Sequence, residues 1–332
     1  MKKITTRNDV ANKAGVSPAV VSYVLNNSNY VSEEKREAVL AAVKELGYYP
    51  NYLARGLKTS RSSHFAIICD EIQNEIFTEM EDALYAKGYY VSLCSSRIDD
   101  DFVNMLVNRR FEGIFMTSNA FSVEQLNYIA ASGIPMAIFK TRKYVGLDSR
   151  IVTVAPDFYN GIMKSMEYLM LKGHKRIALI PPVRYKTKGV QGDDFRVRAY
   201  VESLEKNGLP VDNALVCTNT RTVETICESI FEMMTKSGNM LRPTACVVGN
   251  DYLAAQLIKY LKNLNLRVPQ DVAIIGSDNS AYASITSPTL TTISYSKKEL
   301  AQKVVDKLFQ IINGETPEGE YIDVSLVIGG SA

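Results

Sequence analysis

Side chains that could carry out catalysis are few in this sequence of 332 residues. Histidine, the most frequent general acid or base, occurs twice, as His64 and His174. His64 lies in a linker-like stretch, and we expect His174, in the run Gly-His-Lys-Arg, to make a structural hydrogen bond before a strand. The sequence contains no metal-spaced cluster of histidines and cysteines, nucleophile elbow, phosphate-binding loop or dinucleotide fingerprint. These residue types predict that the protein is not an enzyme and needs no metal or cofactor.

The five cysteines form no Cys-x-x-Cys pair and lie mostly in apolar, strand-like runs. We interpret them as reduced residues of a hydrophobic core. The N-terminus becomes polar at once, unlike a signal peptide, and no run approaches the ~18 apolar residues that would span a membrane. The sequence therefore predicts a cytoplasmic protein without a membrane segment.

Positive charge is concentrated near the N-terminus. Residues 1–61 carry ten Lys and Arg against five Asp and Glu, whereas the whole chain has a net charge of only +2. A small basic module attached to a nearly neutral body is typical of a protein that binds the phosphate backbone of nucleic acid. A solvated basic surface would give the same balance, so the pattern of helices has to decide.

Two short helices joined by a tight turn are predicted in this basic module. Thr6, followed by Asp9, makes a capping box that begins the first helix, and Gly15 ends it. Ser17 is a good cap for a second helix, with Pro18 at its first position, over about residues 18–25. The turn between the helices therefore spans only a few residues.

A third helix is predicted between Ser32, as its cap, and Gly47. Its apolar stripe consists of Val39, Leu40, Val43 and Leu46. Two short helices and a packing helix indicate a helix-turn-helix reader of DNA, although a three-helix protein-binding module has the same pattern. The side chains that we expect at base edges in the major groove are small or polar: Ala19, Ser22, Tyr23 and Asn26.

Residues 50–63 are predicted to form a helix of marginal stability followed by a linker. Asn51 can cap roughly two helical turns that carry Leu53 and Leu57 on one face, and Gly56 weakens this helix. A helix of this kind suits folding on DNA with an apolar side chain wedged into the minor groove. The alternative is an interdomain linker with one or two buried leucines.

From residue 64 onward, apolar runs alternate with amphipathic segments. This alternation predicts an α/β fold with parallel sheets covered by helices on both faces, and its length suggests two doubly wound lobes. Ligands of such sheets bind beyond the carboxyl ends of the strands. The predicted strands are residues 65–69, 89–94, 113–117, 135–139, 176–181, 245–249 and 271–277. The predicted helices include residues 75–87, 123–132, 161–172, 196–207 and 251–264.

The first sixty residues resemble the headpiece and hinge of the lac repressor (LacI/GalR) family. The resemblance rests on the collinear runs DVA, AGVS, VVSYVLN, VS and LGYYPNYLARGL, which begin at residues 9, 14, 20, 31 and 46. It implies that Pro18, Ala19 and Tyr23 read bases, and that Leu57 is the minor-groove lever. Many family members carry Arg or His where this chain has Tyr23, so the operator sequence cannot be carried over. The candidate DNA-binding residues are Thr6, Ser17, Pro18, Ala19, Ser22, Tyr23, Asn26, Asn51, Ala54, Leu57 and Lys58.

The resemblance continues through the body, at the runs GIP, GHKRIA, ND, VPQDV, GSD and PTLTTI. It implies a core like that of periplasmic sugar-binding proteins, with two lobes, three crossovers and an effector between the lobes. The expected organisation is a headpiece over residues 1–49, a hinge and linker over 50–63, and a core over 64–332. Within the core, we expect lobe 1 at about 64–155 and 291–316, and lobe 2 at about 156–290 and 317–332.

Three residues match the effector contacts of the family: Arg196, Asn250 and Asp278. A guanidinium, an amide and a carboxylate around one cleft can orient a polyhydroxylated or heterocyclic ligand. The alternatives are turn capping for Asn250 and Asp278, and a surface ion pair with Asp193 or Asp194 for Arg196.

Two basic stretches depart from the pattern of relatives. One is residues 140–143, and the other contains Arg184, Lys186 and Lys188. Both follow predicted strands, which favours an anionic effector such as a phosphorylated sugar, unless these loops are merely solvated. First-lobe effector contacts cannot be transferred from relatives, because residues 68–81 and 99–108 look shorter than usual.

The resulting hypothesis is a homodimeric repressor that binds a pseudo-palindromic DNA operator and is controlled allosterically by a sugar or a phosphorylated sugar. The chain shows no heptad tail after its last strand, which favours a dimer over a tail-mediated tetramer. A secreted solute-binding protein is the rival hypothesis, and the basic headpiece argues against it. We expect Leu57→Ala to weaken operator binding strongly and to leave effector binding intact, as measured by DNA titration.

Overall fold

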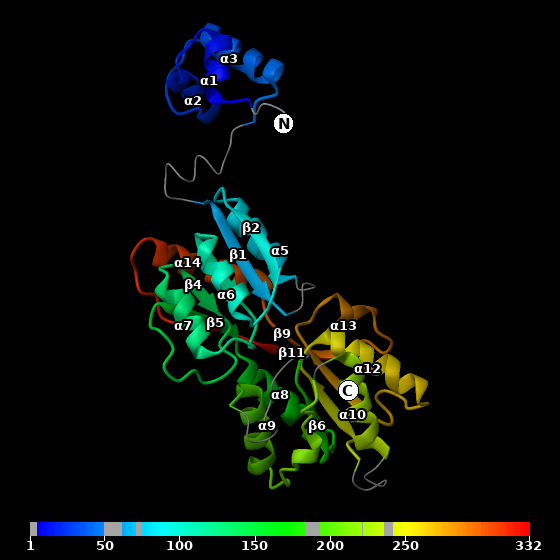
Figure 1. The fold of residues 1–332 in the computed structure, drawn as a ribbon. Coiled ribbons are helices and arrows are strands. Elements are labelled where there is room, and N and C mark those ends of the chain that lie inside the picture. Colours follow the sequence, from blue (N-terminus) through cyan, green and yellow to red (C-terminus); the bar gives the residue numbers. More distant parts are fainter. Residues whose placement is uncertain (1–4, 50–61, 71–74, 183–192, 221, 236–241) are drawn as a thin grey trace. The chain divides into compact units, whose positions relative to one another are not determined.

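The computed structural model divides the chain into two compact units, Met1–Ser62 and Ser63–Ala332 (Figure 1). It describes residues 5–49, 62–70, 75–182, 193–220, 222–235 and 242–332. Each unit has its own hydrophobic core. The first unit is the helical headpiece that the sequence predicts, and the second is an α/β core.

The headpiece contains three helices: α1 (Arg7–Ala14), α2 (Pro18–Asn26) and α3 (Glu33–Leu46). The predicted capping box is confirmed, because the Thr6 side chain accepts from the Asp9 N–H and the Asp9 carboxylate accepts from the Thr6 N–H. Gly15 ends α1 with a left-handed φ of 65°, and the Ser17 side chain caps α2 by accepting from the Val20 N–H. Local capping chemistry therefore sets these helix ends.

The headpiece core is formed by valine and alanine side chains together with Tyr48, and Val10, Val21 and Val39 are fully buried. The predicted apolar stripe of α3 is wrong for Leu40, whose surface is 49% exposed. Successive residues of a helix are ~100° apart, so Leu40 projects away from the face that buries Val39.

Lobe 1 of the core is built on a parallel sheet of six strands. In spatial order these are β10 (Glu320–Ile322), β5 (Ile151–Pro156), β4 (Met136–Ile138), β3 (Gly113–Met116), β1 (His64–Cys69) and β2 (Tyr90–Ser95). The helices of this lobe are α5 (Ile76–Tyr85), α6 (Asp100–Asn108), α7 (Val123–Ala131) and α14 (Lys297–Ile312). In Figure 1 the red helix α14 lies beside the cyan helix α5, so distant parts of the sequence complete this lobe.

Lobe 2 is built on a sheet of five strands, parallel except for its edge strand β11. In spatial order these are β11 (Ser325–Val327), β9 (Thr291–Ser294), β8 (Ala273–Ser277), β7 (Ala245–Val248) and β6 (Ile177–Ile180). Its described helices are α8 (Phe158–Leu171), α9 (Phe195–Lys206), η2 (Asn213–Leu215), α10 (Val223–Thr235), α12 (Asp251–Asn263) and α13 (Ala281–Ile285).

The strand order corrects two expected lobe boundaries. Strand β9 pairs with β8 and so belongs to lobe 2, which moves the second crossover from residue 290 to the segment between β9 and α14. Strand β10 pairs with β5 and so belongs to lobe 1, which moves the third crossover from residue 317 to the segment between β10 and β11. Long-range pairing partners decide which sheet takes such short strands, and local sequence does not report them.

All seven predicted strand runs contain strands, and the five predicted helices are present with small shifts at their ends. Elements that were not assigned from sequence include β5, whose β-branched run IVTVAP is the signal that would have predicted it. Four of the five cysteines are buried: Cys69, Cys217, Cys227 and Cys246. None of the helices within the described ranges is long and apolar enough to cross a membrane.

Candidate effector site and DNA-reading surface

The three predicted effector residues line one cavity between the lobes. Arg196 lies in the first turn of α9, Asn250 lies two residues after the end of β7, and Asp278 directly follows β8. Parallel strands end at the same edge of their sheet, so these turns bring the three side chains together. The cavity has a volume of about 110 Å³ and is open to solvent.

Arg196 is held by a buried, bidentate ion pair with Asp194. Its Nε and Nη2 atoms donate to the two carboxylate oxygens, each at 3.0 Å, and both residues are more than 90% buried. The guanidinium also lies 5.3 Å from the centre of the Phe158 ring. The ion pair considered as an alternative therefore exists, but at the cavity wall instead of the surface. It fixes the orientation of Arg196 toward the cavity.

Asn250 combines capping with a place in the cavity. Its side-chain oxygen accepts from the Leu253 N–H at 2.8 Å and so caps α12. The cap fixes the rotamer of the amide while the residue lines the cavity.

Asp278 lies in a turn with left-handed backbone geometry, at φ 101°, and is followed by Asn279 at φ 46°. The buried Tyr295 hydroxyl donates to Asp278 Oδ1 at 3.2 Å. Burial, and next the negative charge of Asp278, raise the pKa of Tyr295 well above its usual value. Tyr295 is therefore a neutral phenol at neutral pH and can keep donating to the carboxylate.

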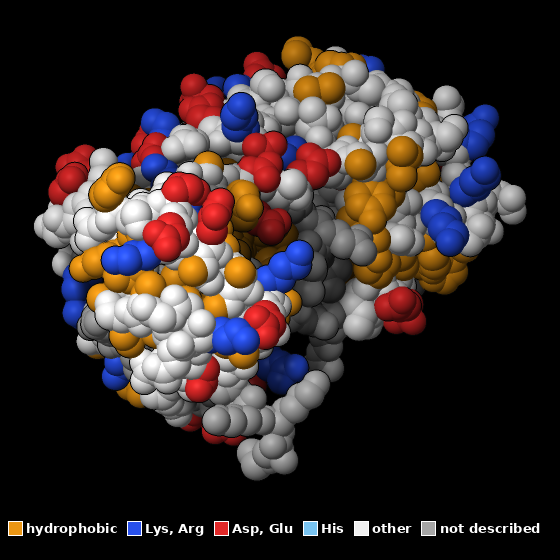
Figure 2. Space-filling model, turned by 90° about the horizontal axis from the view of Figure 1, so that it is seen from above, with side chains coloured by type: hydrophobic (Ala, Val, Ile, Leu, Met, Phe, Trp, Pro, Cys, Tyr) orange, Lys and Arg blue, Asp and Glu red, His pale blue; other side chains and the backbone are white. Residues whose placement is uncertain are grey.

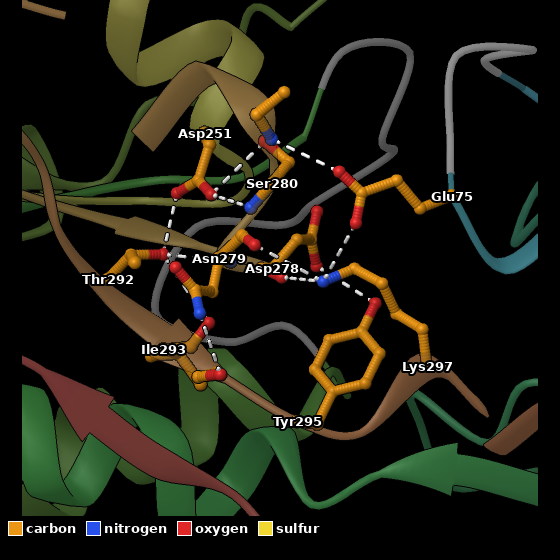
Figure 3. Close-up of polar contacts among 11 residues, drawn as sticks. Glu75, Asp251, Asp278, Asn279, Ser280, Thr292, Ile293, Tyr295 and Lys297 are labelled. Carbon is orange, nitrogen blue, oxygen red and sulfur yellow. Dashed lines mark hydrogen bonds and ion pairs between the residues drawn. The ribbon is translucent and has the colours of Figure 1, made fainter. Parts of the chain in front are cut away.

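Asp251, a fully buried residue at the start of α12, holds the turn that carries Asp278 through hydrogen bonds (Figure 3). Its Oδ2 accepts from the Ser280 N–H at 2.7 Å, and its Oδ1 accepts from the Thr292 hydroxyl at 2.6 Å. Gly276 makes room for this carboxylate, because a Cβ there would lie 2.2 Å from Oδ1. Burial raises the pKa of Asp251 to about 6, although the hydrogen bonds act in the opposite direction.

We expect Asp251 to make stability depend on pH. A carboxyl that binds its proton more tightly in the folded protein than in the unfolded chain destabilises the fold as pH rises from its unfolded pKa toward its folded pKa. The window therefore runs from the ordinary Asp pKa of 3.8 to about 6. Between these limits, the free energy of unfolding should fall by about 3 kcal/mol because of this group. Denaturant titrations at several pH values measure this dependence.

The matched variant for this measurement is Asp251→Asn, which does not titrate. We expect it to be less stable at neutral pH, because its amide nitrogen must face one of the donors that now bind Asp251. The difference in stability between the two proteins should grow toward acid pH, because protonation of Asp251 stabilises the wild-type protein there and the variant does not titrate at this position. Parallel pH profiles would show that Asp251 titrates at an ordinary pKa.

Lobe 1 supplies further cavity residues, which were not predicted from the sequence. Asp70 follows β1 and accepts hydrogen bonds from the hydroxyls of Ser96 and Ser118. The Thr141 hydroxyl, after β4, donates to the side chain of Asn119, after β3. Each of these residues directly follows a predicted strand or lies within a few positions of its end, and that position is the signal that could have found them.

The basic residues that suggested an anionic effector do not line the cavity where the structure describes them. Arg142 donates to the Phe121 carbonyl at 3.1 Å and lies 5.0 Å from the centre of the Tyr144 ring. Lys140 lies over the ring of Tyr321. Residues 183–192, which contain the second basic stretch, lie outside the described residues. The charged lining residues in the described ranges are Asp70, Arg196 and Asp278.

The headpiece exposes most of the residues predicted to read DNA on and next to α2. Ser17, Pro18, Ala19 and Asn26 are exposed, as is Thr6 at the start of α1, and Tyr23 is 37% exposed. Ser22 is half-buried, and it accepts through its carbonyl and its hydroxyl from the Asn26 amide at 2.8 and 3.1 Å. The predicted hinge residues Asn51, Ala54, Leu57 and Lys58 lie outside the described residues.

Two family descriptions match this chain. Residues 6–51 match the family described as bacterial regulatory proteins, lacI family. Residues 166–332 match the periplasmic binding protein-like domain. The chain belongs to the LacI family of transcriptional regulators. It combines the DNA-binding headpiece of that family with an effector-binding core.

The similarity to known proteins covers nearly the full length of this chain. The HTH-type transcriptional repressor PurR of Pectobacterium atrosepticum is 29% identical over 330 residues, which cover 97% of this chain and 94% of the relative. The fold is similar to that of the lac repressor dimer bound to operator and the anti-inducer ONPF, with a TM-score of 0.80, 23% identity and 99% of each chain covered. It is also similar to the transcriptional regulator CelR–cellobiose complex, with a TM-score of 0.69, 24% identity and coverage of 99% and 100%.

These similarities bear out the prediction that this LacI-family chain is not an enzyme, because the relatives are transcriptional repressors. Among the residues that the structure describes, no cluster of three or more His, Cys, Asp or Glu side chains has the arrangement of a metal site.

Proposed function

We propose that this protein is a sequence-specific repressor whose affinity for its operator is controlled by a sugar or sugar derivative bound between the lobes. The observation that carries the proposal is the convergence of Arg196, Asn250 and Asp278 on one cavity. Lobe 1 completes the polar lining with Asp70 and Asn119. Fixed donors and acceptors on several sides suit a ligand with hydroxyl groups around a ring.

The cavity also offers aromatic surface, which suits the apolar face of a sugar ring. Phe139, Phe158 and Tyr295 line it together with the polar residues. The similarity of the fold to the CelR–cellobiose complex supports a carbohydrate ligand for the same kind of cavity.

Within this proposal, a neutral sugar is favoured over a phosphorylated one. The described lining carries two carboxylates, Asp70 and Asp278, and its one guanidinium is already paired with Asp194. A phosphate group would meet carboxylates without a second cation to balance it. A thermal-shift screen of neutral sugars against their phosphates tests this, and stabilisation by phosphates alone would reverse the preference.

We further propose that the repressor acts as a homodimer that places two headpieces on a pseudo-palindromic operator. Exposed hydrophobic side chains support an interface between copies: Tyr85 at the end of α5, and Tyr90 and Leu93 on β2, the edge strand of lobe 1. Figure 2 shows hydrophobic side chains at the surface among charged ones. Effector binding would change the relative angle of the two first lobes in the dimer, and so the spacing at which both hinge segments reach DNA.

Selection of genomic DNA fragments by the purified protein, at one fixed salt concentration and with or without candidate sugars, tests the proposal as a whole. We expect one pseudo-palindromic sequence to be enriched, and its occupancy to change with one sugar. Binding without sequence preference under every condition would leave a ligand-binding protein without operator specificity.

A further inference from the structure

Two charged residues of lobe 1 form an ion pair next to the turn that carries Asp278, a residue of the cavity lining. Glu75 directly precedes α5, and Lys297 is the first residue of α14. The Lys297 Nζ lies 3.5 Å from Glu75 Oε2, and the lysine side chain is only 12% exposed. Chain positions more than two hundred residues apart therefore form one ion pair on lobe 1.

Both members of this pair also contact a turn of lobe 2, residues 278–281 (Figure 3). The Lys297 Nζ donates to the carbonyl oxygen of Asp278 and, at 3.3 Å, to that of Asn279. Glu75 Oε1 accepts from the Ala281 N–H at 3.1 Å. The pair thus holds both ends of the turn that carries Asp278.

Lobe 2 anchors the same turn from its other side. Asp251 accepts from the Ser280 N–H, the Asn279 N–H donates to the Thr292 hydroxyl at 3.2 Å, and the Asn279 amide donates to the Ser294 hydroxyl at 3.2 Å. The turn is therefore fixed within lobe 2, and its contacts with Glu75 and Lys297 depend on where lobe 1 lies.

We propose that Glu75 and Lys297 are positioning residues that fasten lobe 1 to the turn bearing Asp278 and so stabilise the closed arrangement of the two lobes. Separation of the lobes would break the contacts to Asp278, Asn279 and Ala281 together, because all of them start from the same ion pair. Hydrogen bonds to charged groups are strong and directional, so this group of contacts favours a closed state over intermediate ones. The inference deepens the proposed function, because it couples lobe closure to an effector-binding residue.

A second interlobe contact allows closure to be distinguished from a local effect. The Phe195 N–H, in the first turn of α9, donates to the Thr141 carbonyl of lobe 1 at 2.9 Å. Neither residue contacts Glu75 or Lys297 in the interactions described above. If the pair stabilises closure, its loss must also weaken the bond at Phe195.

Amide hydrogen exchange of the full-length protein, without any ligand, tests the inference in Glu75→Ala, Lys297→Met and the double variant. We expect exchange at residues 278–281 and at the Phe195 amide to accelerate by about tenfold or more in each single variant. The double variant should add little, because the two side chains act as one unit. Controls are Glu81→Gln on α5 and Lys298→Met on α14, which alter exposed neighbours and should leave both regions unchanged.

Acceleration confined to residues 278–281 would show a local contact and overturn a role in closure, and unchanged exchange would overturn the inference entirely. Unfolding midpoints of all variants identify any general loss of stability, which would accelerate exchange in α12 as well. Since the experiment contains no effector, failure of every sugar to bind would count against the proposed function and not against this result.

Discussion

Arg196→Ala is expected to eliminate the response to the effector and to destabilise the core. The substitution removes a guanidinium that lines the proposed effector cavity, and it leaves Asp194, which is 1% exposed, without its bidentate partner. Removing one member of a buried pair typically costs about 3–5 kcal/mol. Affinity for a sugar identified by thermal shift should fall by about 100-fold or more, since a charge-assisted contact is lost together with its fixed geometry. Calorimetric titration and denaturant unfolding measure the two effects.

Two controls separate binding from folding in this experiment. Arg196→Lys keeps the charge near Asp194 but loses the planar fork, so we expect most of the stability to return and much of the affinity to stay lost. Arg198→Ala alters an exposed arginine of the same helix, paired with Glu202 at 3.4 Å, and should change both quantities little. Full effector affinity in Arg196→Ala would remove Arg196 from the binding site.

Tyr23→Ala is expected to lower affinity for the selected operator by about tenfold or more, because Tyr23 is predicted to contact base edges and such contacts contribute to discrimination. The substitution removes no Lys or Arg, so binding to non-specific DNA and the salt dependence of binding should not change. Titrations of operator and of scrambled DNA at several salt concentrations distinguish these quantities. Repeating the fragment selection with the variant should relax the preference at one position of each half-site.

Leu40→Ala is the matched control in the headpiece. Leu40 is 49% exposed on α3, the packing helix, and lies outside the predicted DNA-reading set. We expect it to leave operator affinity unchanged. If Tyr23→Ala binds operator as tightly as the wild type, then the phenol does not read bases, and specificity lies with other residues of α2.

The headpiece was largely predictable because short-range interactions define it. Thr6 and Ser17 cap helices within three residues of themselves, and Gly15 supplies a left-handed residue that other side chains adopt at a cost. The exposure of Leu40 was missed, since an apolar residue beside a buried stripe does not reveal from sequence on which side of the boundary it lies.

The sequence by itself also determined that two doubly wound lobes follow the headpiece, and its resemblance to the family selected Arg196, Asn250 and Asp278 as candidate effector contacts. Only the tertiary structure decided which sheet receives β9 and β10, that Arg142 turns away from the cavity, and that Asp251, Glu75 and Lys297 converge on one turn. The physical reason is the range of the interactions. Capping and periodicity act within a few residues, whereas pairing between sheets and burial of a charge depend on partners brought together by the whole fold.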